Sequence, residues 1–210
     1  MLGKTHDQMQ LERVAFFSDA VFAIAITLLV IEVRVPGIHP VSDAALGDAL
    51  LRLIPNYIGF VISFFVIGRF WVGHHRTFGH LARVDEKLVW LNLLFLLTIA
   101  FLPYPTTLIA NYLGLRVAVC FYAAWLALAG LLNAAVIRHA LRGPLVGAHS
   151  QPDTRARVLR TSWSPLVIGA LAFAAGLIQP LYVLVPLIAS PLIIKLLGAQ
   201  FPIRRRRAAG

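Results

Sequence analysis

The chain has 210 residues, of which 59% are hydrophobic and 13% are charged, whereas soluble domains contain roughly 45–50% apolar and about 25% charged residues. This composition excludes a water-soluble globular domain, and the single cysteine excludes an intrachain disulfide and a cysteine-based metal cluster. The formal net charge of +10 is compatible with nucleic-acid binding or with basic loops on the cytoplasmic side of a membrane. The position of the charges therefore decides between these two classes.

Long apolar runs predict six transmembrane helices in one channel domain that covers residues 1–210, because about 20 apolar residues cross a bilayer. The first run is too long for a signal peptide and contains Asp19 and Glu32, so we expect it to remain in the mature protein. The last apolar stretch is long enough for two crossings, with Gln179 and Pro180 between them. The predicted spans are residues 14–33, 49–72, 88–110, 117–137, 162–178 and 181–201.

The basic residues predict that both termini are cytoplasmic. With six spans the termini share a side, and most loop Lys and Arg residues then fall on that side, as the positive-inside rule requires. Three arginines fall on the opposite side: Arg34, Arg52 and Arg116. Topology thus explains the net charge, and we do not expect nucleic-acid binding. The basic tail Arg204–Arg207 is expected to contact anionic lipids, at ~1 kcal/mol per residue, although a topology signal alone is an equally good interpretation.

The first predicted span contains the polar positions that require an explanation. A charged side chain at the centre of a bilayer costs about 2.5–3.5 kcal/mol or more, so Asp19 needs a partner or a water-filled cavity. At 100° per residue, Ile24, Leu28 and Ile31 align on one stripe, and Asp19 lies about 140° away from it. If several copies of this helix surround an axis, they form either a ring of carboxylates or a hydrophobic constriction. Helical periodicity leaves both arrangements open.

Possible hydrogen-bond donors to Asp19 are predicted at the same membrane depth. They are located at the cytoplasmic ends of the first three spans: Arg13, Trp71, His74, His75 and Asn92. If the aliphatic stripe faces the axis, these donors can satisfy a carboxylate that is buried between helices. The pair Ser18–Asp19 is also compatible with a proton relay, because intramembrane carboxylates are typical of both roles.

The segment Arg13-Val14-Ala15-Phe16-Phe17-Ser18-Asp19 resembles the R-x-x-x-F-S-D signature of the transmembrane protein 175 family, the endosomal and lysosomal potassium channels and their prokaryotic relatives. The residues that follow it are also similar to the family. Six spans in one chain resemble the prokaryotic members, which have one six-helix repeat per chain and assemble as homotetramers. The specific part of the resemblance lies in the first span.

The resemblance implies an all-α, homotetrameric potassium channel of the prokaryotic plasma membrane, with the first helix lining a central pore. Ile24 would form the constriction, Leu28 and Ile31 would add apolar layers, and Thr27 would be the candidate for selectivity. The sequence contains no T-V-G-Y-G filter, so preference for potassium would arise from partial dehydration and would be moderate. The residues implied to join the first helix to its neighbours are Arg13, Phe17, Ser18, Asp19, Trp71, His75 and Asn92.

Two other functions and a metal site were considered. A proton-coupled secondary transporter would use Asp19 and Glu32, but such proteins usually contain an inverted repeat that is not evident here. A non-conducting scaffold would tolerate polar residues on the aliphatic stripe. Among the histidines, we expect His75 in the network and His74 and His80 in the headgroup layer. No H-E-x-x-H motif is present, and we expect no metal, cofactor or enzymatic activity.

Overall fold

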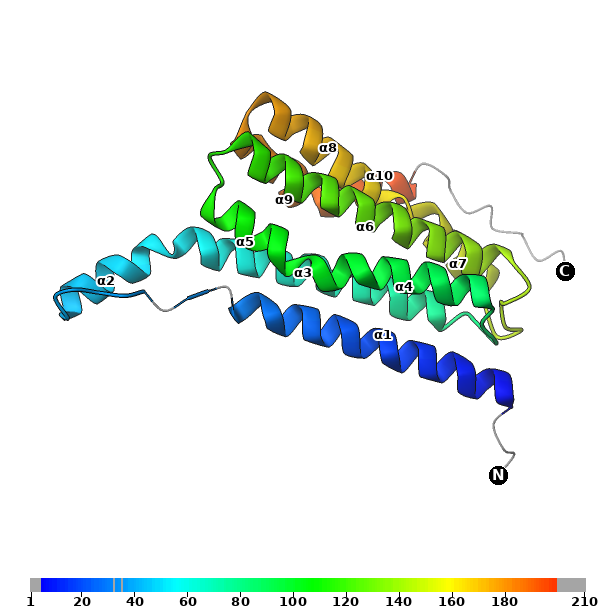
Figure 1. Ribbon diagram of the computed structural model, residues 1–210. Helices are drawn as coiled ribbons and strands as arrows, with labels where there is room; N and C mark the ends of the chain where they lie inside the picture. The colour runs from blue at the N-terminus through cyan, green and yellow to red at the C-terminus, as the bar shows by residue number, and fades with distance from the viewer. Residues whose placement is uncertain (1–4, 32, 35, 200–210) are drawn as a thin grey trace, which may run out of the picture.

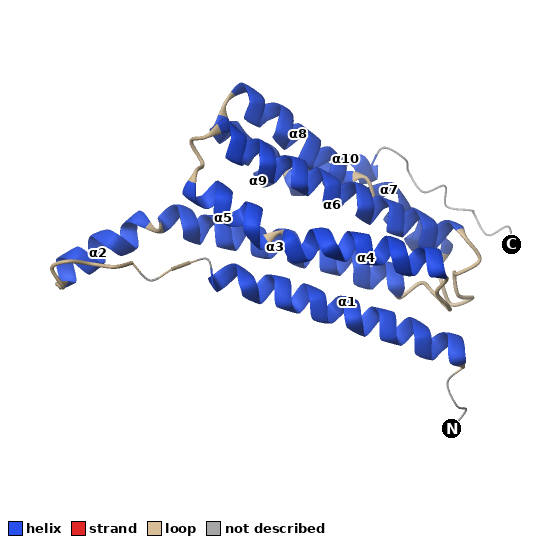
Figure 2. Cartoon of the chain, in the orientation of Figure 1, coloured by secondary structure: helices blue, strands red, loops and turns tan. Residues whose placement is uncertain are grey.

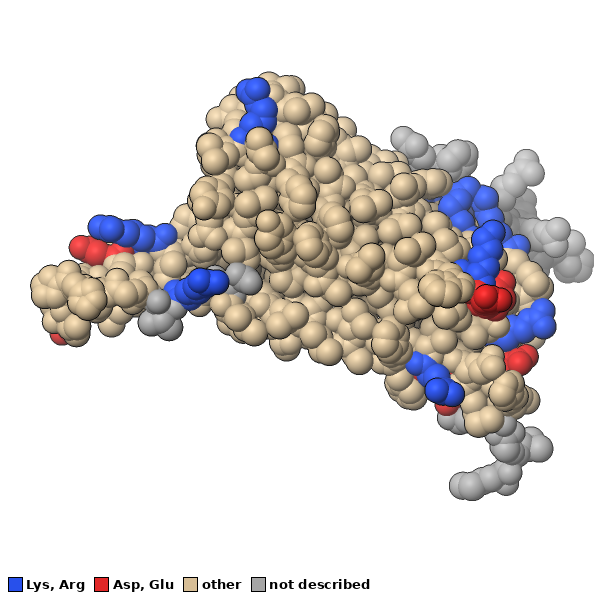
Figure 3. All heavy atoms as spheres, in the orientation of Figure 1, with Lys and Arg blue, Asp and Glu red and all other residues tan. Residues whose placement is uncertain are grey.

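The computed structural model describes residues 5–31, 33–34 and 36–199. Long helices lie side by side, with α1 along one edge of the molecule and α8 along the opposite edge (Figure 1). The described residues contain helices and loops without a strand (Figure 2), and charged side chains gather at the two ends, with an uncharged band between them (Figure 3). The prediction of an all-α, multi-pass membrane protein is thus confirmed.

Among the residues that the structure describes, five segments are long and apolar enough to cross a membrane, and a bent pair of segments would make a sixth. The bent pair consists of Pro180–Ile188 and Ser190–Leu197, which meet at an angle of 52°. The helices in chain order are α1 (His6–Ile31), α2 (Asp43–Arg52), α3 (Ile54–Phe78), α4 (Glu86–Phe101), α5 (Pro103–Asn111), α6 (Arg116–Arg142), α7 (Pro152–Thr161), α8 (Ser164–Ile178), the 3₁₀ helix η1 (Pro180–Val183), α9 (Leu184–Ile188) and α10 (Ser190–Ala199).

Prolines explain why several helices differ from the predicted spans. The predicted span 49–72 begins inside α2, whereas α3 begins at Ile54 with Pro55 in its first turn, where a missing N–H costs nothing. The predicted span 88–110 is divided into α4 and α5 at Leu102, immediately before Pro103. In both places the proline favours a new helix start over a continuous helix.

The stretch that corresponds to the predicted span 181–201 is bent in the residues that the structure describes. This stretch is divided into η1, α9 and α10, with Pro186 inside α9 and Pro191 in the first turn of α10. A proline inside a helix removes one backbone hydrogen bond and clashes with the preceding turn. Glu32 and the tail Arg204–Arg207 lie outside the described residues.

Helices α6 and α8 pack at very short range. A Cβ atom on Gly130 of α6 would overlap the backbone of Leu166, and a Cβ atom on Gly169 of α8 would lie 2.5 Å from the backbone nitrogen of Ala127. Small residues permit such close contact between helices in membranes. The pair α6–α8 therefore forms a closely packed side of the molecule, and α1 lies on the other side (Figure 1).

Candidate functional site

Helix α1 has one buried face. Its buried residues are Ser18, Phe22, Ala25 and Leu29, whose spacing of four, three and four residues places them on one side of a helix. This side packs against α3 and α4, where the Phe22 ring lies 6.0 Å from the ring of Phe95 between centroids. The sequence of α1 thus fixes which side of the helix faces its own protomer.

The aliphatic stripe of α1 points away from the protomer. The exposed fractions of Ile24, Leu28 and Ile31 are 58%, 40% and 65%. At 100° per residue the centre of this stripe lies about 120° around the helix axis from the buried face. The stripe is therefore free to contact lipid or other copies of the chain.

Thr27 is also exposed on α1, about 170° around the axis from the buried face. Its Oγ1 donates a hydrogen bond to the carbonyl oxygen of Ile24 at 2.9 Å. This is the common bond of a helical threonine to its own backbone. The bond uses the hydroxyl proton and leaves lone pairs of Oγ1 available to a cation.

A chain of buried hydrogen bonds joins α1 to α3 and α4. Asn92 Nδ2 donates to Ser18 Oγ at 2.9 Å, and Ser18 Oγ donates to the carbonyl of Val14 at 2.8 Å. Asn92 Oδ1 lies 2.9 Å from His74 Nε2. Ser18, His74 and Asn92 are each at most 2% exposed, so every one of these bonds replaces a bond to water that burial removed.

Asp19 is bound from α3. Trp71 Nε1 donates to Asp19 Oδ1 at 2.8 Å, and the Trp71 ring stacks on His75 with 5.6 Å between centroids. An indole N–H is a donor only, and a carboxylate oxygen is a suitable acceptor for it. The signature pair Ser18–Asp19 therefore contacts two different helices through adjacent residues.

The structure places His74, His75 and Arg13 differently from the expected arrangement. His74, which we expected in the headgroup layer, is the hydrogen-bonded histidine, whereas His75 is exposed and contacts Trp71 by stacking. The reason is helical register, since His74 continues the buried face of α3 one turn after Phe70. Arg13 forms no hydrogen bond or ion pair with any described residue; with Phe17 it lines a cavity of about 620 Å³.

His80 lies in the loop after α3, where we expected a headgroup position. Its Nδ1 is 2.9 Å from the hydroxyl of Ser150. Burial, helped by the positive charges of His149 and Arg155, lowers the pKa of His80 below its usual value. The side chain therefore belongs to the contact between two loops. The described residues contain no group of three or more His, Cys, Asp or Glu side chains that could hold a metal ion.

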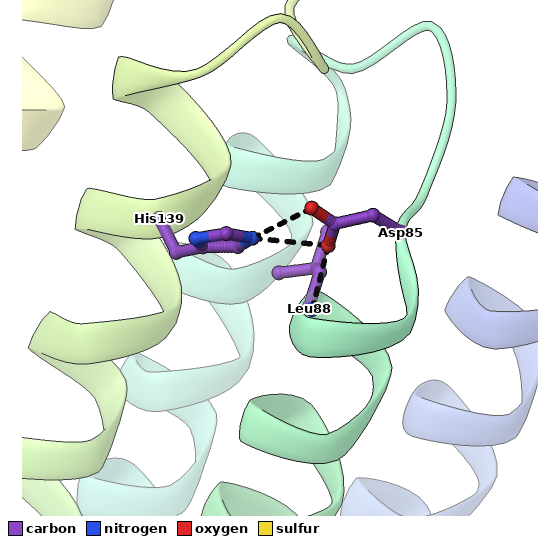
Figure 4. A network of polar contacts seen from close by, with 3 residues as sticks. All are labelled: Asp85, Leu88 and His139. Carbon is purple, nitrogen blue, oxygen red and sulfur yellow. Dashed lines mark hydrogen bonds and ion pairs between the residues drawn. The ribbon is translucent and has the colours of Figure 1, made fainter.

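The start of α4 is tied to the end of α6 by Asp85, which sequence analysis did not identify. Asp85 caps α4 by accepting from the Leu88 N–H at 2.7 Å, and its two oxygens lie 3.0 and 2.9 Å from His139 Nε2 (Figure 4). Partial burial raises the pKa of Asp85, but the bonds from Leu88 and His139 outweigh burial and hold this pKa below its usual value. An aspartate before a helix start was the available signal.

Comparison with known proteins identifies the family. Residues 13–103 match the family described as endosomal/lysosomal potassium channel TMEM175. A protein of Streptomyces collinus that is named as a potassium channel is 40% identical over 174 residues, which cover 78% of this chain and 83% of that protein. The human endosomal/lysosomal proton channel TMEM175 is 25% identical over 176 residues, which cover 82% of this chain and 34% of that protein.

A solved structure has the same fold. The crystal structure of a lysosomal potassium-selective channel TMEM175 homolog from Chamaesiphon minutus superposes with a TM-score of 0.79 and 31% sequence identity, and the match covers 91% of this chain and all of that chain. The match with the Streptomyces protein extends over most of both sequences. The chain therefore belongs to the TMEM175 family.

Proposed function

We propose that the protein is a homotetrameric potassium channel in which α1 lines the central pore and Ile24 forms a hydrophobic constriction. The observation that carries the proposal is the two-sided character of α1. One face is bound to α3 and α4 through Ser18 and Asp19, and the aliphatic stripe is directed away from the protomer. A helix held in this way presents the same stripe in every copy.

A single protomer cannot enclose a path for ions along this exposed stripe, so conduction requires several copies. Symmetric copies around one axis would bring Ile24, Leu28 and Ile31 together as successive rings. Rings of aliphatic side chains close a pore by excluding water. The relatives named as potassium channels support this proposal, as does the similarity to a potassium-selective channel.

Potassium selectivity is proposed to come from partial dehydration at the narrow rings. A potassium ion would lose part of its hydration shell at Ile24 and meet the Thr27 hydroxyl oxygens next to it. Thr27 Oγ1 already donates to a carbonyl, so its proton is used and its lone pairs remain available to a cation. A site without carbonyl rings should distinguish potassium from sodium only moderately.

The orientation follows from the charges at the two ends of the bundle. Most basic residues lie at the end where α1 begins and α3 and α6 terminate, and Figure 3 shows the basic side chains gathered there. We propose that this end faces the cytoplasm of a prokaryotic cell, which places the N-terminus there. The basic tail Arg204–Arg207 is proposed to follow the same leaflet and contact its anionic lipids.

The alternative of a proton-coupled transporter that uses Asp19 and Glu32 is not favoured. Both the bacterial relatives and the more distant human relative are named as channels. Asp19 is held by Trp71, which is the arrangement of a structural joint. The channel proposal requires no cofactor, since ions move down their own gradient.

Potassium flux from liposomes that contain the purified protein tests the proposal. Replacing Ile24→Asn would put polar groups at the constriction and lower the dehydration barrier. A reduction of about 1.4 kcal/mol would raise the flux about tenfold. The flux is measured as the rate at which an imposed potassium diffusion potential collapses.

The control is Leu171→Asn, the same kind of polar substitution on a different exposed surface. Leu171 is 47% exposed on α8, which lies on the opposite side of the molecule from α1 (Figure 1). The channel proposal predicts that this variant conducts as the unmodified protein does. Absence of potassium flux from the unmodified protein, or an equal effect of both variants, would contradict it.

A further inference from the structure

A second polar cavity lies on the other side of α3 from α1. It has a volume of about 160 Å³, is open on one side, and is lined by residues of α3, α6, α7, α8, α9 and α10. Its polar part lies at the end of the molecule where α3 terminates, and its lining includes Arg69 and Arg76. The cavity takes no part in the proposed pore, because α1 does not contribute to it.

Two arginines of α3 line the cavity without a partner among the residues that the structure describes. Arg69 and Arg76 are two turns apart on α3 and therefore share one face of the helix. Neither forms an ion pair or hydrogen bond with any described residue, and no described Asp or Glu lines the cavity. Both arginines are exposed. Two arginines that line one cavity without a carboxylate favour an anion there, since arginine binds phosphate oxygens through paired N–H groups.

Asn133 is an independent indication of a ligand. Its side chain lines the same cavity from α6, is only 5% exposed, and forms no hydrogen bond with any described residue. Buried polar side chains are almost always hydrogen-bonded. Ser162 and Ser164 in the same lining follow that rule, because their hydroxyls donate to backbone carbonyls at 2.8 and 2.7 Å. No described side-chain nitrogen or oxygen that is fully buried lacks a hydrogen-bond partner, so the amide of Asn133 is accessible from the cavity and its N–H groups are available to a ligand there.

The remaining lining is apolar. Leu126 and Ile168 lie deeper in the bundle, and Val66 continues the lining on the α3 side. A ligand that fills this space would place an anionic group between the arginines and Asn133 and an apolar group beside the aliphatic side chains. This combination is the chemistry of an acidic phospholipid. Free phosphate shares only the anionic part.

We propose that this cavity binds a phosphate-type anion, namely the headgroup of an anionic phospholipid, through Arg69, Arg76 and Asn133. The headgroup would accept N–H bonds from both guanidinium groups and from the Asn133 amide. The site is separate from the basic C-terminal tail, and the proposal does not depend on potassium conduction. Bound lipid would join α3 to the helices on the far side of the bundle from the proposed pore.

Lipid binding to the purified full-length protein tests this proposal. The protein in detergent is titrated with phosphatidylglycerol or with zwitterionic phosphatidylcholine, and the lipids bound per protomer are counted by native mass spectrometry. We expect phosphatidylglycerol to bind more tightly than phosphatidylcholine. Arg76→Gln should weaken phosphatidylglycerol binding about fivefold, which corresponds to the ~1 kcal/mol of one basic residue at an anionic lipid surface.

The matched control is Arg83→Gln, which removes the same charge from the loop after α3 without altering the cavity lining. This control keeps the basic tail. It should change phosphatidylglycerol binding less than twofold. An equal loss in Arg76→Gln and Arg83→Gln would overturn the proposal, because it would show that the lipid responds to the general charge of this surface.

Asn133→Leu tests the geometry without a change of charge. If the arginines attract lipid only through the charge of the surface, this variant should bind phosphatidylglycerol as the unmodified protein does. The proposed site predicts that binding weakens fivefold or more. If Asn133→Leu does not fold, Asn133→Asp replaces it, because a carboxylate between the arginines would pair with them and exclude the anion. Retention of lipid by the folded Asn133 variant would overturn the proposal.

A second titration with inorganic phosphate separates the two sources of the anion. Displacement of phosphatidylglycerol only at phosphate concentrations far above that of the lipid supports the lipid as ligand. Phosphate binding at low concentration that Arg76→Gln and Asn133→Leu weaken would support the same anion site with free phosphate as its ligand. If Arg76→Gln and Asn133→Leu both bind phosphate and lipid as the unmodified protein does, the result would contradict the site with either ligand.

Discussion

Asn92 on α4 donates its side-chain N–H to the hydroxyl of Ser18 on α1 at 2.9 Å, across 74 positions of sequence. The same amide group contacts His74 on α3 through its oxygen. One side chain thus satisfies polar groups of two other helices in a region from which water is excluded. The orientation of α1, and with it the direction of the aliphatic stripe, depends on this contact and on the Trp71–Asp19 bond.

Replacing Asn92→Leu should destabilise the protein. The variant leaves Nε2 of His74 without a partner and removes the bond that the Ser18 hydroxyl accepts, and an unsatisfied buried group costs about 1–3 kcal/mol. Thermal unfolding of the purified protein in detergent measures the loss. Asn111→Leu is the control, because Asn111 is exposed at the end of α5. The unfolding temperature of this variant should differ little from that of the unmodified protein. A variant at Asn92 as stable as this control would show that the contact does not hold α1.

Gly130→Ala should separate α6 from α8. The added methyl group would overlap the backbone of Leu166, which cannot move aside as a flexible side chain can. Overpacking of this kind typically costs 1–3 kcal/mol. Gly68→Ala on α3 is the control, because its Cβ would meet no atom within 4 Å, and alanine favours a helix. The unfolding temperature of Gly130→Ala should therefore be lower than that of the unmodified protein, and that of Gly68→Ala should be equal or higher.

Asp85→Asn should reduce stability in a pH-dependent manner. The pKa of Asp85 is lower in the folded protein than its usual value, so its ionised form stabilises the fold above about pH 4. This contribution is lost as the pH falls through the lowered folded pKa. Asparagine still caps a helix, so the substitution isolates the charge. The pair with His139 is partly exposed, and we expect at most about 1 kcal/mol.

The measurement for Asp85→Asn is the difference in unfolding temperature from the unmodified protein at several pH values. The difference should be constant near neutral pH and should shrink below about pH 4. A difference that grows as the medium becomes more acidic would have the wrong sign for a lowered carboxyl pKa.

The sequence alone places the polar pair and the aliphatic stripe on different sides of α1, because helical periodicity is a local property. Helical periodicity alone places Ile24, Leu28 and Ile31 together, and the structure leaves all three exposed. The same periodicity, applied to α3, would have put His74 on the buried face with Phe70 and Thr77. We expected His75 there because the prediction rested on membrane depth and resemblance, without the register of α3.

Other features depend on contacts that hydropathy cannot reveal. Prolines such as Pro103 and Pro186 cause the break between α4 and α5 and the bend at the end of the described chain. Hydropathy averaged over an apolar run does not reveal single prolines. The cavity lined by Asn133 requires the packing of several helices, since Asn133 in isolation is one polar residue in a long apolar span. Its role depends on which helices surround it.

The most direct test of the account is the accessibility of position 24 from water inside the proposed pore. In a Cys120→Ala background, Ile24→Cys and the control Leu171→Cys are each placed in liposomes, and potassium flux is measured before and after a charged, membrane-impermeant methanethiosulfonate reagent is added to both sides. The account predicts that the reagent reduces the flux through Ile24→Cys and leaves Leu171→Cys unchanged. Equal flux through both variants after treatment, with the cysteine at position 24 unmodified, would contradict a pore lined by α1.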